Sequence, residues 1–113
     1  MQTVIVVDDE PGITLTLSLL LRRKGYEVYT ANSGPAALRL TAVFCPDFLL
    51  TDIVMPGMSG LELIEHIRQA CPSTRIILFT GKPDSIPDDR LPVQKVFFKP
   101  VNPSELLNCL QAA

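Results

Sequence analysis

The sequence predicts an α/β fold with a five-stranded parallel sheet and helices on both faces. Short apolar runs of strand length alternate along the chain with segments of helical periodicity. The intervening segments supply the crossovers that parallel strands require. Polar residues that bind metal or phosphate follow four of these runs. Because ligands of open α/β sheets bind outside the carboxyl ends of the strands, we expect one site assembled from distant segments.

The first half of the chain contains two predicted strand-helix units. Thr3–Val7 is the first strand, and the helix after it ends near Gly25. Apolar residues of this helix recur at the spacing of one face, namely Ile13, Leu17, Leu20 and Leu21. Glu27–Ala31 is the second strand. Asn32-Ser33-Gly34-Pro35 then opens a second helix with a capping residue and a proline in the first turn.

The second half begins with a continuously apolar run at Phe48–Leu50, which is typical of a strand covered on both faces. The loop Met55–Met58 follows it. Ser59 and Glu62 form a capping box that opens a helix through about Gln69, with Leu61, Ile64 and Ile67 turned inward. Further elements are strands at Arg75–Phe79 and Val96–Phe98, and a last helix opened by Asn102-Pro103-Ser104-Glu105 that buries Leu106, Leu107 and Leu110.

The segment Gly81–Pro92 departs from this alternation. It contains Pro83, Pro87 and Pro92. A proline in the interior of a helix costs roughly 3 kcal/mol, so at most one helical turn is expected here. We therefore predict that the fourth helix of the fold is reduced or absent.

Length and charge limit the classes of function. At 113 residues we expect one domain, residues 1–113, with a single hydrophobic core. The formal net charge of −2 provides no broad basic surface, so we predict neither direct nucleic-acid binding nor membrane binding. There is no apolar stretch of about 18 residues and no signal-peptide pattern at the N-terminus. A cytoplasmic location is the expectation.

The cysteines predict no metal or redox centre. Cys45, Cys71 and Cys109 are odd in number and widely spaced, and none forms a Cys-x-x-Cys pair. We expect three reduced, partly buried thiols.

The residues at the ends of the predicted strands indicate phosphoryl chemistry with a metal ion. Asp8 and Asp9 follow the first strand and Asp52 the third, and carboxylates brought together repel one another unless a cation compensates. An all-oxygen site suits Mg²⁺, which keeps waters and binds substrate phosphate. Lys99 adds a positive charge, and the Thr80 hydroxyl can donate to an anionic oxygen.

Such a site complements a transferring phosphoryl group, whose transition state spreads negative charge over its oxygens. Aspartate is a known covalent nucleophile for phosphate. Asp52 is the best candidate because its strand is expected to be central, and the Pro56-Gly57 loop leaves room for a donor.

Four ordered motifs resemble the receiver domain of two-component response regulators. They are VDDE at Val7–Glu10, TDIVMPGMSGLEL at Thr51–Leu63, FTG at Phe79–Gly81 and FFKP at Phe97–Pro100. The match extends over essentially the whole chain and is specific, because separate motifs occur in order at compatible spacing. The resemblance implies a flavodoxin-like, doubly wound fold with the known strand order 2-1-3-4-5.

The resemblance also implies roles for individual residues. Asp52 is the phosphoacceptor, which receives a phosphoryl group from a sensor histidine kinase or a histidine phosphotransfer protein. Asp9, Asp52 and the backbone carbonyl of Val54 ligate Mg²⁺, and Asp8 reaches it through water. Thr80 is the switch hydroxyl, and Lys99, before a cis peptide bond to Pro100, binds the phosphoryl group. Members of the family catalyse only their own phosphorylation and dephosphorylation, and then change their binding to a partner or effector domain.

The sequence departs from the family pattern at two places, which leaves an alternative function open. Val96 stands where the family usually has the aromatic residue that couples to the threonine, and Gly81–Pro92 replaces a full helix of the usual output face. A constitutive interaction module with weakened phospho-switching is therefore the alternative function. We do not expect an aspartate-nucleophile phosphatase, because no acid stands two residues after Asp52.

Overall fold

Five parallel strands form one sheet in the order β2-β1-β3-β4-β5, which confirms the predicted topology. The structure is a computed structural model, and it describes residues 1–82, 84 and 93–112. The strands are β1 (Thr3–Val7), β2 (Glu27–Ala31), β3 (Phe48–Asp52), β4 (Arg75–Thr80) and β5 (Lys95–Phe98). β3 lies at the centre of the sheet, and all five of its residues are buried.

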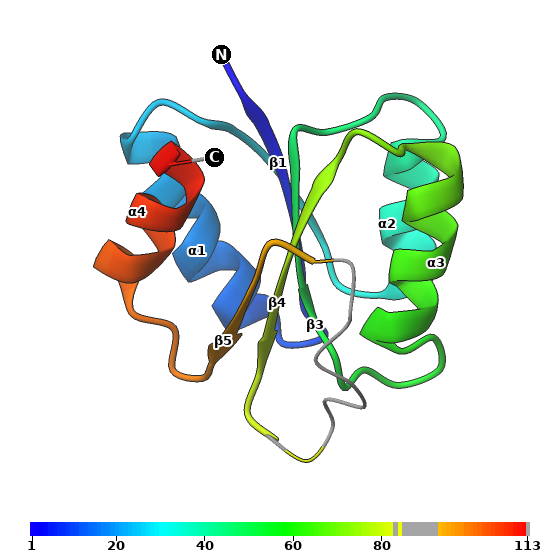
Figure 1. Cartoon of the computed structure of the whole chain (residues 1–113). Coiled ribbons are helices and arrows are strands. Elements are labelled where there is room, and N and C mark those ends of the chain that lie inside the picture. The colour runs from blue at the N-terminus through cyan, green and yellow to red at the C-terminus, as the bar shows by residue number, and fades with distance from the viewer. Residues whose placement is uncertain (83, 85–92, 113) are drawn as a thin grey trace.

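Helices cover both faces of this sheet. The described helices are α1 (Pro11–Arg23), α2 (Gly34–Thr41), α3 (Gly60–Ala70) and α4 (Pro103–Ala112). Figure 1 shows α1 and α4 on one face, and α2 and α3 on the other. The predicted loss of a helix concerns residues 81–92, most of which lie outside the described residues, so it stays a prediction. No helix in the described part of the chain is long and apolar enough to cross a membrane.

The predicted capping residues begin three of the helices. Ser33 Oγ accepts a hydrogen bond from the Ala36 N–H at 3.1 Å, and Asn102 Oδ1 accepts one from the Glu105 N–H at 3.1 Å. Ser59 and Glu62 form the predicted capping box at the start of α3. These bonds satisfy N–H groups that would otherwise have no partner in the first helical turn.

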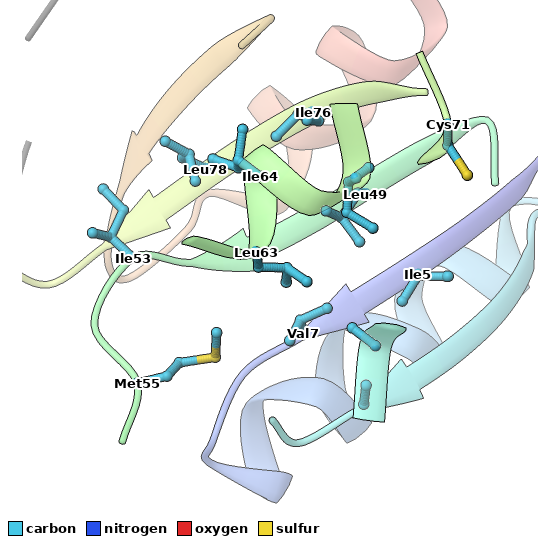
Figure 2. Close-up of a cluster of buried hydrophobic side chains, with 13 residues drawn as sticks. Ile5, Val7, Leu49, Ile53, Met55, Leu63, Ile64, Cys71, Ile76 and Leu78 are labelled. Carbon is cyan, nitrogen blue, oxygen red and sulfur yellow. The ribbon is translucent and has the colours of Figure 1, made fainter. Parts of the chain in front are cut away.

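Two apolar clusters form the core, one on each face of the sheet. Figure 2 shows the cluster between the sheet and α3, in which Leu49 and Leu78 face Leu63 and Ile64. The predicted inward set of α3 is partly wrong, because Leu63 is fully buried whereas Leu61 is only partly buried. The buried positions of α3 are Gly60, Leu63, Ile64 and Ile67, a helical face rotated from the predicted one.

The buried face of α1 also differs from the prediction. Thr14 and Ser18 are buried, whereas Ile13 and Leu20 are only partly buried. Burial of the two hydroxyls is tolerated because each donates to a backbone carbonyl of the same helix, at 3.0 Å for Thr14 and 2.9 Å for Ser18. Apolar periodicity does not detect polar residues that satisfy their hydrogen bonds locally.

The expectation of three reduced cysteines is wrong for two of them. Cys45, before β3, and Cys71, the C-cap of α3, form a disulfide with a Cα–Cα distance of 5.5 Å. Cys109 on α4 is a free, partly buried thiol. An odd count and wide spacing do not reveal which chain segments meet, and here the crossover from β3 through α3 returns to the start of β3.

Gly60 allows α3 to start directly against the end of β3. Its N–H donates to the Ile53 carbonyl at 2.8 Å, and a Cβ atom at this position would lie 2.0 Å from the Asp52 carbonyl oxygen. We predict that Gly60→Ala lowers the free energy of unfolding by about 3 kcal/mol, because the backbone of β3 must shift. Gly12→Ala is the control, since no atom lies within 4 Å of its added Cβ. Urea denaturation that shows equal stability for both variants would contradict this account.

Candidate functional site

The carboxyl ends of four strands meet at one cavity of about 270 Å³. Asp52 and Thr80 are the last residues of β3 and β4, while Asp8 and Asp9 follow β1 and Lys99 follows β5. The structure therefore brings together all the side chains predicted from the strand endings. The cavity is lined by Asp9, Glu10, Asp52, Val54, Thr80, Gly81, Lys82 and Lys99.

The Lys99 ammonium joins two buried carboxylates. Its Nζ lies 2.9 Å from Asp8 Oδ2 and 2.9 Å from Asp52 Oδ2. The ammonium also lies 5.5 Å from the centre of the Phe79 ring, within the range of a cation–π contact. The Lys99 N–H donates to the Thr80 carbonyl at 2.8 Å, and the Lys99–Pro100 peptide bond is cis, as the resemblance implies.

The pKa of Lys99 reflects two opposing effects. Burial lowers it, but hydrogen bonds and charge interactions with Asp8 and Asp52 outweigh burial, so that the pKa is raised above its ordinary value. The side chain is therefore a permanent cation at neutral pH. It provides the compensating charge that clustered carboxylates require.

Backbone N–H groups fix the orientation of the two carboxylates. Asp8 is fully buried, and its Oδ1 accepts a hydrogen bond from the Glu10 N–H at 2.9 Å. Asp52 Oδ1 accepts one from the Val54 N–H at 3.2 Å. In each aspartate the other oxygen, Oδ2, is directed to Lys99.

The same carboxylates fit a divalent cation. One oxygen each from Asp8, Asp9 and Asp52 lies within 4.8 Å of the others. Apart from the ion pair with Lys99, the buried Oδ2 of Asp8 has no hydrogen-bond partner among the described residues. Asp9 is exposed and Val54 lines the cavity, so an ion would keep contact with water. A carboxylate site open to water has the chemistry that Mg²⁺ prefers.

Thr80 is fully buried and is engaged by the loop after β4. Its hydroxyl donates to the Lys82 carbonyl at 3.2 Å and accepts from the Lys82 N–H at 3.0 Å. Val96 pairs with Leu78 in the sheet, whereas Phe98 pairs with Thr80 and is 55% exposed. The aromatic residue that pairs with Thr80 in the sheet is thus Phe98.

Sequence reasoning also missed Glu10 and Gly81 as cavity residues. Glu10 is the N-cap of α1, and Gly81 directly follows β4. Their positions in the sequence could have indicated this, because Glu10 follows Asp9 and Gly81 follows Thr80. Residues that follow the parallel strands of one sheet lie at the same edge of that sheet.

Removal of the Lys99 charge should reveal the metal site. We predict that Lys99→Met lowers the free energy of unfolding by roughly 1–3 kcal/mol, less than for a fully buried pair because Lys99 keeps some contact with solvent. Millimolar Mg²⁺ should stabilise this variant more than the wild type, because the ion replaces the lost charge. Lys95→Met, at an exposed position of β5, is the control. Equal Mg²⁺ effects on all three proteins in urea denaturation would contradict the assignment.

Comparisons with known proteins agree with this geometry. The family model described as "Response regulator receiver domain" matches residues 4–111. The chain is 34% identical over 115 residues to the transcriptional regulatory protein KdpE of Mycobacterium tuberculosis, in a match that covers 100% of this chain and 51% of KdpE. The chain thus spans about half the length of KdpE, and 36% of that of the M. tuberculosis regulator TcrX.

Solved structures show the same fold. The response regulator TrrA of Thermotoga maritima, in complex with Mg²⁺-BeF, is 34% identical with a TM-score of 0.89, and the match covers 99% of this chain and 98% of TrrA. TrrA in complex with the histidine kinase ThkA is similar with a TM-score of 0.87 at 34% identity, covering 99% of this chain and 97% of that one. The cluster of three carboxylates and one lysine at the end of a five-stranded sheet therefore has a known context: the chain belongs to the receiver domains of two-component response regulators.

Proposed function

We propose that Asp52 is the phosphoacceptor of this receiver domain and that residues 1–113 act as one unit. The observation that carries the proposal is the contact of 2.9 Å between the Lys99 ammonium and Asp52 Oδ2 in a cavity lined by further acids. A carboxylate held next to a fixed cation is well placed to attack phosphorus, because the cation offsets the negative charge that accumulates there.

In the proposed reaction, an oxygen of Asp52 attacks the phosphorus atom of a phosphohistidine. The new O–P bond forms as the N–P bond to the donor imidazole breaks, and the imidazole keeps the electron pair. Lys99 then binds a phosphoryl oxygen, and Thr80 donates its hydroxyl once it leaves Lys82. Asp9, Asp52 and the Val54 carbonyl would hold Mg²⁺, with Asp8 acting through water, and the bound ion would offset phosphoryl charge.

The proposed donor is a sensor histidine kinase or a histidine phosphotransfer protein, as the complex of the similar TrrA with ThkA suggests. The only reactions of the chain itself are its own phosphorylation and dephosphorylation. The phosphorylated receiver domain changes its binding to an effector domain or a downstream protein, and it does not bind nucleic acid directly. We propose a cytoplasmic location for this function.

A surface beside the site supports docking of a protein donor. A mostly apolar cavity of about 440 Å³ lies between α1 and the segment after β5, and Lys99 forms part of its wall. Next to it on α1, Leu15 and Leu19 are 57% and 50% exposed. They share one helical face with Gly12 and Thr16, which line the cavity. A continuous apolar surface at the edge of the phosphoryl site suits a helix of the donor.

We predict that Leu15→Glu slows phosphoryl transfer from a protein donor by about tenfold or more, because it places a charge on an apolar contact. Labelling by acetyl phosphate should not change, since this small donor needs no such contact. Val43→Glu, another exposed apolar position, is the control. The measurement is the rate of transfer from a phosphorylated histidine phosphotransfer protein that labels the wild type, and an equal rate for both variants would contradict the surface.

Two observations favour the alternative, a constitutive interaction module. The Thr80 hydroxyl is already bonded to both backbone groups of Lys82, and Val96 replaces the usual aromatic residue. Movement of the Thr80 hydroxyl to a phosphoryl group therefore requires that both hydrogen bonds to Lys82 break. If the Thr80 hydroxyl does not move, phosphorylation leaves the binding of partners unchanged.

Phosphorylation with a small donor separates the two functions. With Mg²⁺ and acetyl phosphate, the wild type should gain one phosphoryl group that is stable in acid and labile in base. Asp52→Asn should not gain it, because the amide is not a nucleophile. Mass spectrometry provides the measurement, and Asp47→Asn, at the opposite end of β3, is the control. A wild type that remains unmodified would favour the constitutive module, and labelling of Asp52→Asn would place the acceptor elsewhere.

A further inference from the structure

The disulfide closes the part of the chain that contains Asp52. Cys45 lies just before β3, and Cys71 is the C-cap of α3. The ring of residues 45–71 therefore contains β3, the loop after it and α3. The bond lies at the amino end of β3, at the opposite end of the strand from the acidic cavity.

The two cysteine residues differ sharply in access to solvent. Cys45 is exposed, whereas Cys71 is 2% exposed and belongs to the apolar cluster between the sheet and α3. Figure 2 shows Cys71 at the end of that cluster. A dissolved thiol or disulfide can therefore approach Cys45 but not Cys71.

Other contacts hold the two cysteine segments together without the bond. The Thr74 hydroxyl donates to the Pro46 carbonyl at 2.6 Å, and the Arg75 N–H donates to the Asp47 carbonyl at 3.0 Å. Cys45 Sγ lies 3.7 Å from the Ala70 carbonyl oxygen, which can accept an S–H hydrogen bond in the reduced form. These contacts do not involve the disulfide, so we expect the two cysteines to stay side by side in the folded protein after reduction.

We infer that Cys45 and Cys71 form a reversible redox site that exchanges with small disulfides such as oxidised glutathione. The Cys45 thiolate attacks one glutathione sulfur, which forms a mixed disulfide and releases the other as a thiolate. The Cys71 thiolate then attacks Cys45 Sγ and releases the second glutathione thiolate. The two cysteines lose two electrons and two protons, and the oxidant becomes two glutathione molecules.

Oxidation restrains the β3-α3 unit, and the bond itself lies at the end of β3 opposite to Asp52. Cross-linking the ends of this unit reduces the conformations open to it in locally unfolded states. Amide exchange should therefore slow in β3 and α3 and stay unchanged in α1, which lies on the other face of the sheet. The inference does not depend on phosphorylation of Asp52.

The full chain, reduced and then treated with oxidised glutathione, tests the order of attack. Cys45 and Cys71 of the wild type should together lose two hydrogens and retain no glutathione. Cys71→Ser should retain one glutathionyl group on Cys45. In Cys45→Ser, the rate of modification of Cys71 should be lower by about tenfold or more, because that thiol is buried. Cys109, whose thiol pKa is raised by burial, is the internal control in all three proteins. Equal rates of modification of Cys45 in Cys71→Ser and of Cys71 in Cys45→Ser would overturn the inference. A stable glutathione adduct on Cys45 or Cys71 of the wild type would also overturn it.

If a serine variant fails to fold, hydrogen exchange on the wild type alone still tests the inference. The oxidised form should exchange more slowly than the reduced form in β3 and α3 only, and the reduced form should keep protection throughout the sheet. Identical exchange in the two forms, or global loss of protection on reduction, would overturn the inference.

Discussion

The Lys99 ammonium is placed between two buried carboxylates, and the carboxyl edge of the sheet depends on this ion pair. Asp8 follows β1, Asp52 ends β3 and Lys99 follows β5, so this ion pair connects the ends of three strands. Without it, two acids with little access to water would repel each other. The charge that stabilises the two carboxylates is also the charge that a phosphoryl group would meet. Stability and the proposed chemistry therefore rest on the same contact.

The rest of the fold serves to hold these groups in place. β3 is buried on both faces, so Asp52 has a fixed position at the centre of the sheet. Gly60 lets α3 begin beside the Asp52 carbonyl, and the disulfide ties the far end of the same β3-α3 unit. The strand that ends in Asp52 is thus restrained at both ends, whereas Thr80 is held by hydrogen bonds to Lys82. Any switching is expected on the Thr80 side of the cavity.

The sequence predicted the strands, the helix caps and the convergence of the acids with Lys99 because each follows from local signals and from the order of the elements. A continuous apolar run identified β3, Ser59 and Glu62 marked the start of α3, and the strand endings located the acids and Lys99. It failed where the outcome depends on distant partners. Neither the Cys45–Cys71 bond nor the pairing of Phe98 with Thr80 follows from spacing, because both require the crossover geometry. The buried hydroxyl of Thr14 escaped a pattern based on apolar residues alone.

A crystal structure of the protein with Mg²⁺ and beryllium fluoride would test the central claim most directly. The account predicts that the fluoroberyllate is attached to Asp52 and that Lys99 Nζ moves from its two carboxylates to a fluorine atom. It also predicts that the metal ion is bound by Asp9, Asp52 and the Val54 carbonyl. A structure in which Lys99 still bridges Asp8 and Asp52, or in which the metal ion binds away from these carboxylates, would contradict it.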